Sequence, residues 1–244
     1  MSKLPRIRIN PNPAIHLEPV DDENFCVIVD EFLVDPESVV AYSHAHADKF
    51  SVPERSYPGV LLDVHNDAMI DVVRFIRSAM SKQFSFLKGG IKTSTYLSMA
   101  TMQPDQLSNL QRLCHTDPRP QPDRRNFAAL VYLFRDEEMG GTGFFRWKER
   151  KLVEEATALD LEDPAKALAF LQRYFPTYHR PPCYMTQSNE IAELLCDIPA
   201  RFNRLIFYSG ELPHSASIRA PGKLSTDVSR GRLTLNCFVS VLAG

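Results

Sequence analysis

The sequence contains few cysteines, and their arrangement argues against both a disulfide framework and a thiolate zinc site. Among its 244 residues are five cysteines, an odd number at wide spacings, and no two of them form a Cys-x-x-Cys pair. Disulfide-rich domains and thiolate zinc sites need paired cysteines at short, regular spacings. We therefore expect a protein of a reducing compartment, and the cytoplasm is the simplest one.

Long hydrophobic runs and a surplus of one charge are also missing. The longest apolar run, Phe127–Phe134, has eight residues, whereas a membrane-spanning helix needs about 20. Residues 1–13 are polar and basic and hold three prolines, unlike the apolar segment of a signal peptide. The net charge is −2 and the 28 lysines and arginines are spread along the chain. We expect neither a membrane nor a nucleic-acid partner, and the oligomeric state stays open.

Periodicity and breaker residues predict helices first and then strands, with one helical segment between the strands. Asp35 is expected to cap a helix that begins at Pro36 and ends near Asp48, and Gly89-Gly90 to end a second helix. The predicted strands are 25–29, 91–102, 127–134, 144–147, 204–209 and 232–242. The predicted helices are 36–48, 66–86, 152–161, 163–174 and 190–196.

This order is typical of an α+β fold whose strands form an antiparallel sandwich or jelly roll. We expect a single domain over residues 1–244. Its parts are an N-terminal arm, strand and flanking helices (1–90), a β core (91–147 and 198–244) and a helical insertion (148–197). Segments inserted over an active site commonly act as lids, so the insertion is a candidate lid.

The segment His115-Thr116-Asp117 is the strongest candidate for chemistry. Residues two apart on an extended strand project to the same face, so its histidine and aspartate can bind the same metal ion. A second histidine, His214, follows the β-rich run Leu205–Ser209 and two chain-breaking residues. Two imidazoles and one carboxylate suit iron(II), because they fill three positions around the metal and leave three open.

A possible anion clamp lies on the last predicted strand. Arg232 and Thr234 share one face of it, while the opposite face is apolar. A buried arginine needs an anion, and a guanidinium beside a hydroxyl is well shaped to bind a carboxylate. Arg230, two residues earlier, would project to the same face and is an alternative residue for binding the carboxylate. We favour Arg232, because Thr234 accompanies it inside the regular alternation.

The order His-x-Asp, distal His and Arg-x-Thr resembles the iron(II)/2-oxoglutarate dioxygenase superfamily, in particular its prolyl-hydroxylase-like branch. The similarity covers roughly residues 91–240, and Val27–Leu33 resembles the strand-into-helix entry of many members. A looser resemblance is to uncharacterised bacterial proteins labelled pass1-related. The resemblance implies a double-stranded β-helix, or jelly roll, with flanking helices. The interval from His214 to Arg232 is longer than usual for the branch, so Pro221–Gly231 is expected to bulge out.

The resemblance also implies roles for single residues. His115, Asp117 and His214 would be the catalytic metal ligands for iron(II). Arg232 would pair with the distal carboxylate of the cosubstrate 2-oxoglutarate, and Thr234 would hydrogen-bond it. Tyr132 is a further candidate for contact with 2-oxoglutarate, and its alternative is a core tyrosine.

The implied activity is hydroxylation that consumes dioxygen and converts 2-oxoglutarate to succinate. Related halogenases lack the carboxylate that Asp117 supplies here. The expected substrate is an amino-acid-derived compound, a peptide or protein side chain, or a small metabolite. Two alternatives stay open, namely a non-catalytic jelly-roll protein that binds a metal or ligand, and a zinc-dependent hydrolase. Elsewhere, Arg204 would either contact substrate or cap a turn.

Overall fold

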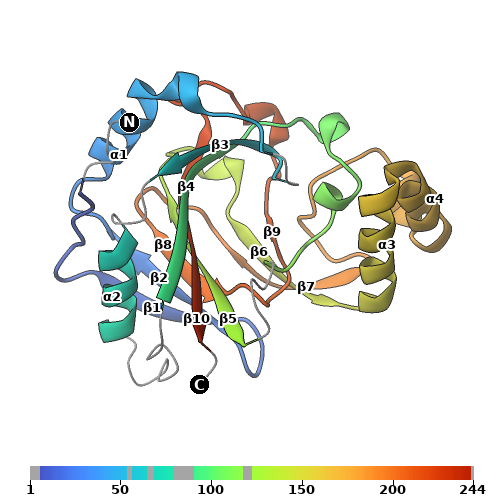
Figure 1. Cartoon of the computed structure of the whole chain (residues 1–244), viewed down its shortest axis with the longest axis horizontal. Coiled ribbons are helices and arrows are strands. Elements are labelled where there is room, and N and C mark those ends of the chain that lie inside the picture. The colour runs from blue at the N-terminus through green and yellow to red at the C-terminus, as the bar shows by residue number, and fades with distance from the viewer. Residues whose placement is uncertain (1–5, 54–56, 65–68, 80–90, 118–122, 243–244) are drawn as a thin grey trace.

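The core of the protein is a sandwich of two antiparallel sheets (Figure 1). The computed structural model describes residues 6–53, 57–64, 69–79, 91–117 and 123–242. Its strands are β1 (Ala14–Pro19), β2 (Phe25–Asp30), β3 (Gly59–Val64), β4 (Ile91–Ala100), β5 (Arg124–Tyr132), β6 (Thr142–Trp147), β7 (Ala192–Ile198), β8 (Leu205–Ser209), β9 (His214–Ala216) and β10 (Arg232–Leu242). Its α-helices are α1 (Pro36–Ala45), α2 (Ile70–Ala79), α3 (Arg150–Glu162) and α4 (Pro164–Tyr174). Short 3₁₀ turns lie at Ala47–Lys49, Pro104–Gln106, Leu110–Arg112, Glu137–Met139, Pro176–His179 and Pro221–Lys223.

The strand order is that of a jelly roll. The larger sheet runs β1-β2-β8-β5-β10-β4-β3, and the smaller sheet runs β7-β6-β9 with a further bridge from His214 to His115. From β5 onward the chain alternates between the sheets, and in this stretch only β6 and β7 follow each other in the same sheet. Such winding of antiparallel strands through two facing sheets defines the jelly roll. The predicted α+β fold with a jelly-roll core is confirmed.

The two faces of the larger sheet have different partners. Leu233, Leu235 and Cys237 of β10 belong to a core cluster that includes Val39 of α1 and Ile76 of α2. Figure 1 shows these two helices away from the smaller sheet, whereas α3 and α4 flank β6 and β7. Alternate residues of a strand point to opposite faces. The other face of β10, which starts with Arg232 and Thr234, is therefore directed into the sandwich, as the alternation predicted.

The predicted helix starts are confirmed by their caps. The Asp35 side chain accepts a hydrogen bond from the Ser38 backbone, and α1 begins at Pro36. Asp163 caps α4 in the same way. The helix expected over 66–86 is confirmed as α2. Its expected ends, together with Gly89-Gly90, lie outside the described residues. Within the described ranges no helix is both long enough and apolar enough to cross a membrane.

The helix predicted over Glu190–Cys196 is wrong. These residues contribute to β7, which pairs with β6 through a register shift between Phe144 and Phe145. The helical part of the insertion, α3 and α4, is confirmed, but the strand β7 occupies the end of the predicted 148–197 insertion and belongs to the smaller sheet. Pairing with β6 overrides the helix propensity of this Glu- and Leu-containing segment.

Candidate metal centre

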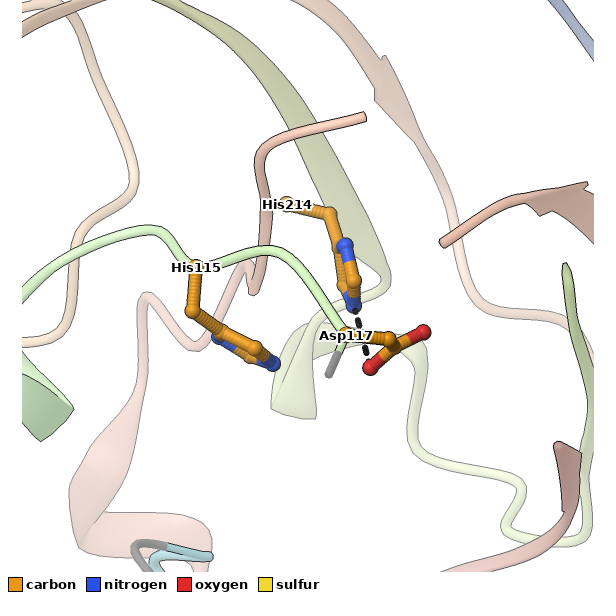
Figure 2. Close-up of side chains that lie close together, drawn as sticks. All are labelled: His115, Asp117 and His214. Atoms are coloured by element: carbon orange, nitrogen blue, oxygen red, sulfur yellow. Dashed lines mark ion pairs between the residues drawn. The ribbon is translucent and has the colours of Figure 1, made fainter. Parts of the chain in front are cut away.

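The structure brings together the three side chains that the sequence predicted as metal ligands. One ligand atom from each of His115, Asp117 and His214 can be chosen so that all lie within 4.8 Å of one another. The Nε2 atom of His214 is 3.8 Å from Oδ1 of Asp117, and the two imidazole centroids are 4.5 Å apart. Figure 2 shows the three side chains directed toward one shared space.

Backbone hydrogen bonds fix the two chain segments against each other. His115 and His214 exchange both of their backbone hydrogen bonds, at 2.9 and 2.8 Å, and the Asp117 amide donates to the Gly210 carbonyl at 2.8 Å. We expected His115 and Asp117 on a regular strand. Instead they lie in an irregular segment that pairs through an isolated bridge at His115. The bridge extends the smaller sheet beyond β9 and so places the ligands at its edge.

Gly210 makes room for the Asp117 carboxylate. A Cβ atom at Gly210 would lie 2.8 Å from Oδ2 of Asp117 and 3.0 Å from its Cβ. Both distances are shorter than ordinary van der Waals contact, so a larger residue would displace the carboxylate. Sequence reasoning read Gly210 as a break in the strand and missed this role. The signal was a glycine four residues before the distal histidine.

Hydrogen bonding and burial set the protonation of both histidines. Nδ1 of His214 donates to the Leu212 carbonyl at 2.8 Å, which leaves Nε2 as the free lone pair beside Asp117. Burial lowers the pKa of His214 to about 4. Desolvation and then the nearby His214 lower the pKa of His115 to about 4, although part of this residue remains exposed. Both imidazoles are therefore neutral ligands near pH 7.

The carboxylate of Asp117 fits a cation. Burial raises its pKa to about 6, and its Oδ2 atom is buried without a hydrogen-bond partner. Buried polar atoms in native proteins are nearly always paired, so an orphan oxygen on a carboxylate that lies beside two imidazoles points to an ion. The donor set of two nitrogens and one carboxylate fits iron(II).

Arg232 is buried, with an exposed fraction of only 3%. Its Nε donates to the carbonyls of Met139 and Gly140, and its Nη2 donates to the Gly141 carbonyl at 2.8 Å. Within the described residues no carboxylate pairs with this guanidinium, and carbonyl dipoles and the ring of Phe134 are what compensate its charge there. Arg230 instead pairs with Asp227 at the surface, where 76% of its side chain is exposed.

The two other predicted contacts for 2-oxoglutarate also lie inside the sandwich. The Thr234 hydroxyl is 2.9 Å from the Ser98 hydroxyl, and both residues are buried. The Tyr132 hydroxyl bonds to Thr142 Oγ1 at 2.8 Å and so connects β5 to β6 across the two sheets. This bond agrees with the alternative of a core tyrosine, and a role for Tyr132 in cosubstrate binding stays a prediction.

Sequence reasoning missed Tyr208 on β8. Its ring packs edge-on against His214, with centroids 4.9 Å apart. Burial raises the pKa of Tyr208, and the charges of Asp117 and Arg232 act on it in opposite directions. This phenol therefore lies near both the candidate ligands and the guanidinium. Ile206 and Tyr208 point into the sandwich, whereas Leu205 and Phe207 pack in the core on the other face of the sheet. Because both faces of β8 are buried, the one signal in the sequence was a tyrosine near the end of an apolar run.

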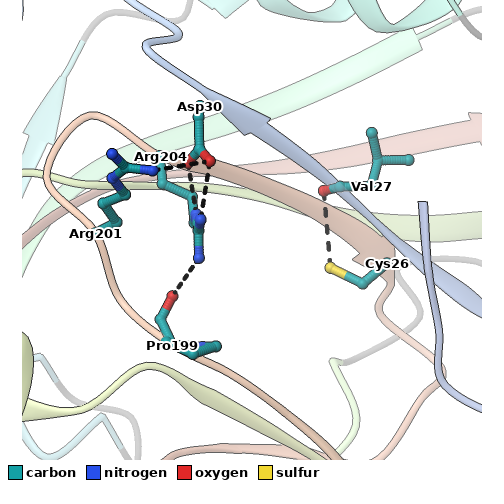
Figure 3. A network of polar contacts seen from close by, with 6 residues as sticks. All are labelled: Cys26, Val27, Asp30, Pro199, Arg201 and Arg204. Atoms are coloured by element: carbon teal, nitrogen blue, oxygen red, sulfur yellow. Dashed lines mark hydrogen bonds and ion pairs between the residues drawn. The ribbon is translucent and has the colours of Figure 1, made fainter. Parts of the chain in front are cut away.

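Arg204 has a structural partner. It binds both oxygens of Asp30 at 2.7 and 2.9 Å, donates to the Pro199 carbonyl, and shares Asp30 with Arg201 (Figure 3). This network fastens the turn before β8 to the end of β2. Two roles were expected for Arg204, contact with substrate or capping of a turn. Its contacts agree with the second role, since they hold the turn before β8 in place.

Comparisons with known proteins identify a family and several distant structures. The model described as "Family of unknown function (DUF6445)" matches residues 11–239. None of the curated proteins matches the sequence. A viral collagen prolyl hydroxylase from Paramecium bursaria Chlorella virus-1, solved with 2-oxoglutarate, is 12% identical with a TM-score of 0.44 over 89% of this chain and 96% of its own. HygX from Streptomyces hygroscopicus, solved with nickel and 2-oxoglutarate, is 14% identical with a TM-score of 0.43 over 91% and 84%. With similarity this distant, function must be argued from the site itself.

Proposed function

We propose a function for this chain, which belongs to the DUF6445 family of unknown function: it is an iron(II)- and 2-oxoglutarate-dependent oxygenase. The observation that carries the proposal is the cluster of His115, Asp117 and His214, with its orphan carboxylate oxygen. The same interior holds the guanidinium of Arg232, which pairs with no carboxylate among the described residues. The reaction would be hydroxylation of a C–H bond in an amino-acid-derived or small-metabolite substrate. The substrate class rests on the sequence resemblance.

The chain's own residues would prepare the metal site. The carbonyl of Leu212 orients the His214 ring, and the Gly210 carbonyl holds the Asp117 backbone. Such supporting hydrogen bonds fix the tautomer and the direction of each ligand. When bound, iron(II) would supply dioxygen activation coupled to oxidation of 2-oxoglutarate. Three ligands leave positions for both reactants.

The anion clamp supports the choice of cosubstrate. Arg232 is held rigidly by three carbonyl contacts, and its charge lacks a carboxylate partner among the described residues. A carboxylate arriving there would be strongly favoured, because the surroundings are apolar and aromatic, including Phe134 at 5.4 Å. We propose that Arg232 and Thr234 bind the distal carboxylate of 2-oxoglutarate.

A zinc-dependent hydrolase fits this site less well. Such an enzyme needs a general base beside the metal-bound water. In the described ranges, the metal-binding group consists of His115, Asp117 and His214, and no further histidine, cysteine or carboxylate joins it. This cluster therefore offers a hydrolase no general base besides its own ligands.

Metal binding tests the proposal. We expect purified protein to take up one equivalent of iron(II) without oxygen, and His115→Ala and His214→Ala to lose nearly all of it. His44→Ala, on the exposed surface of α1, is the matched control and should bind iron like the wild type. Iron content unchanged in both ligand variants would contradict the proposed site.

A further inference from the structure

Tyr57 carries a buried hydroxyl that makes no hydrogen bond of ordinary geometry with a described residue. The residue precedes β3, and its oxygen is buried without a hydrogen-bond partner. Even so, it lies beside the hydroxyls of Ser98 and Thr234, and the charge of Arg232 acts on it. An unpaired buried hydroxyl is costly. Its position at the clamp suggests that the missing partner is a ligand.

The donors and acceptors in the hydrogen bonds that link Asn236, Ser98 and Thr234 can be assigned. Nδ2 of Asn236 donates to Ser98 Oγ at 2.6 Å. The Ser98 hydroxyl is then free to donate to Thr234 Oγ1 at 2.9 Å. With Ser98 as the donor in that bond, the acceptor of the Thr234 hydrogen among the described residues is the Ser98 carbonyl at 3.5 Å, a poor distance. Thr234 therefore keeps a hydrogen available for an incoming acceptor.

Some of the N–H groups of Arg232 already donate hydrogen bonds and are not available to a ligand. Its Nε hydrogen and one of the two Nη2 hydrogens are engaged by the carbonyls of residues 139–141. In the described part of the chain only Nη1 makes no hydrogen bond. A carboxylate has two oxygens and prefers two or more donors. The two oxygens together offer about four acceptor positions, so the carboxylate can also accept hydrogen bonds from hydroxyls besides the N–H groups still free on Arg232. Tyr57 and Thr234 carry the hydroxyls placed beside the guanidinium.

We propose that Tyr57 donates a hydrogen bond to the distal carboxylate of 2-oxoglutarate and makes the pocket selective for 2-oxo diacids over 2-oxo monoacids. The inference rests on the proposed function and adds a residue that no sequence motif marks. Arg232 supplies the charge, Thr234 and Tyr57 supply the hydroxyl donors, and Ser98 and Asn236 position Thr234.

Binding titrations with two 2-oxo acids test this role. Protein loaded with iron(II) without oxygen is titrated with 2-oxoglutarate and with pyruvate, which lacks the distal carboxylate. Tyr57→Phe removes only the hydroxyl, and we expect it to weaken 2-oxoglutarate binding about tenfold, the usual effect of losing a hydrogen bond to a charged group. Pyruvate binding should not change. Tyr174→Phe, on the exposed side of α4, is the control and should bind both acids normally.

The outcomes are distinguishable. Equal 2-oxoglutarate affinity in Tyr57→Phe and the wild type would overturn the inference while leaving the proposed function intact. Equal weakening of both acids would also overturn it, because Tyr57 would then support the pocket as a whole. Iron-loaded wild type that binds no 2-oxoglutarate would remove the proposed function itself. An unchanged melting temperature shows that the variant is folded, and Thr234→Val should reproduce the same selective loss.

Discussion

The Asp117 carboxylate occupies space that is free because residue 210 is a glycine. Because a methyl group at Gly210 would collide with Oδ2 of Asp117, we expect Gly210→Ala to turn the carboxylate away from the two histidines. Iron(II) affinity should fall by about 10- to 100-fold, as for other changes that misorient ligands. Gly222→Ala is the matched control, because nothing lies within 4 Å of its added methyl group. Equal metal affinity in the two variants would show that the Gly210 contact does not matter.

Asn203 supports the turn before β8 with an unusual backbone. Its φ is +62°, and its side chain both accepts from the Leu33 amide and donates to the Leu33 carbonyl at 2.9 Å. We expect Asn203→Ala to lower the free energy of unfolding by about 2–4 kcal/mol, since both bonds are lost and the left-handed backbone is retained. Asn203→Gly should recover about 1 kcal/mol of this loss. Urea unfolding measures both, and a loss that is the same for alanine and glycine would contradict the backbone contribution.

Between elements, the ion pair that joins β2 to the turn before β8 should make stability depend on pH. The hydrogen bonds from Arg204 hold the pKa of Asp30 below its ordinary value. A lowered folded-state pKa stabilises the protein fully above the ordinary carboxyl pKa of about 4. This stabilisation is lost as the pH falls through the lower folded-state value.

Asp30→Asn tests this linkage. We expect it to cost about 1–2 kcal/mol at pH 7, because the partly buried Arg204 loses its charged acceptor. The difference from the wild type should shrink below about pH 4, where Asp30 itself becomes protonated. Unfolding by urea across this range provides the measurement. A difference that stays constant down to pH 2 would show that the pair does not lower the pKa of Asp30.

Local patterns predicted most elements, and the failures share a physical cause. The alternation of β10 and the caps at Asp35 and Asp163 depend on neighbouring residues, so the sequence alone revealed them. The local sequence of β7 predicts a helix, but the segment forms a strand because it pairs with β6, which is distant in the sequence. The edge strand β1 was missed between the N-terminal arm and the strand predicted at 25–29, since its residues are exposed almost throughout.

At the scale of the whole molecule, the jelly-roll winding assembles the site. It pairs His115 with His214 at the edge of the smaller sheet and places Arg232 on the facing sheet. The chemical types and order of these residues predicted the candidate ligands and the clamp. Gly210, Tyr208 and Tyr57 were missed, because their positions at the site arise from close approach in space and local sequence signals for them are weak or lacking.

The most direct test of the oxygenase proposal is the visible charge-transfer band of iron(II) chelated by a 2-oxo acid. We predict a weak band when iron(II) and 2-oxoglutarate are added to the wild type without oxygen. Asp117→Ala and Arg232→Ala should abolish or weaken it, the first through loss of a ligand and the second through loss of the anion clamp. Iron shown to be bound in the wild type with no band on adding 2-oxoglutarate would contradict the account, because the cosubstrate would then not reach the metal.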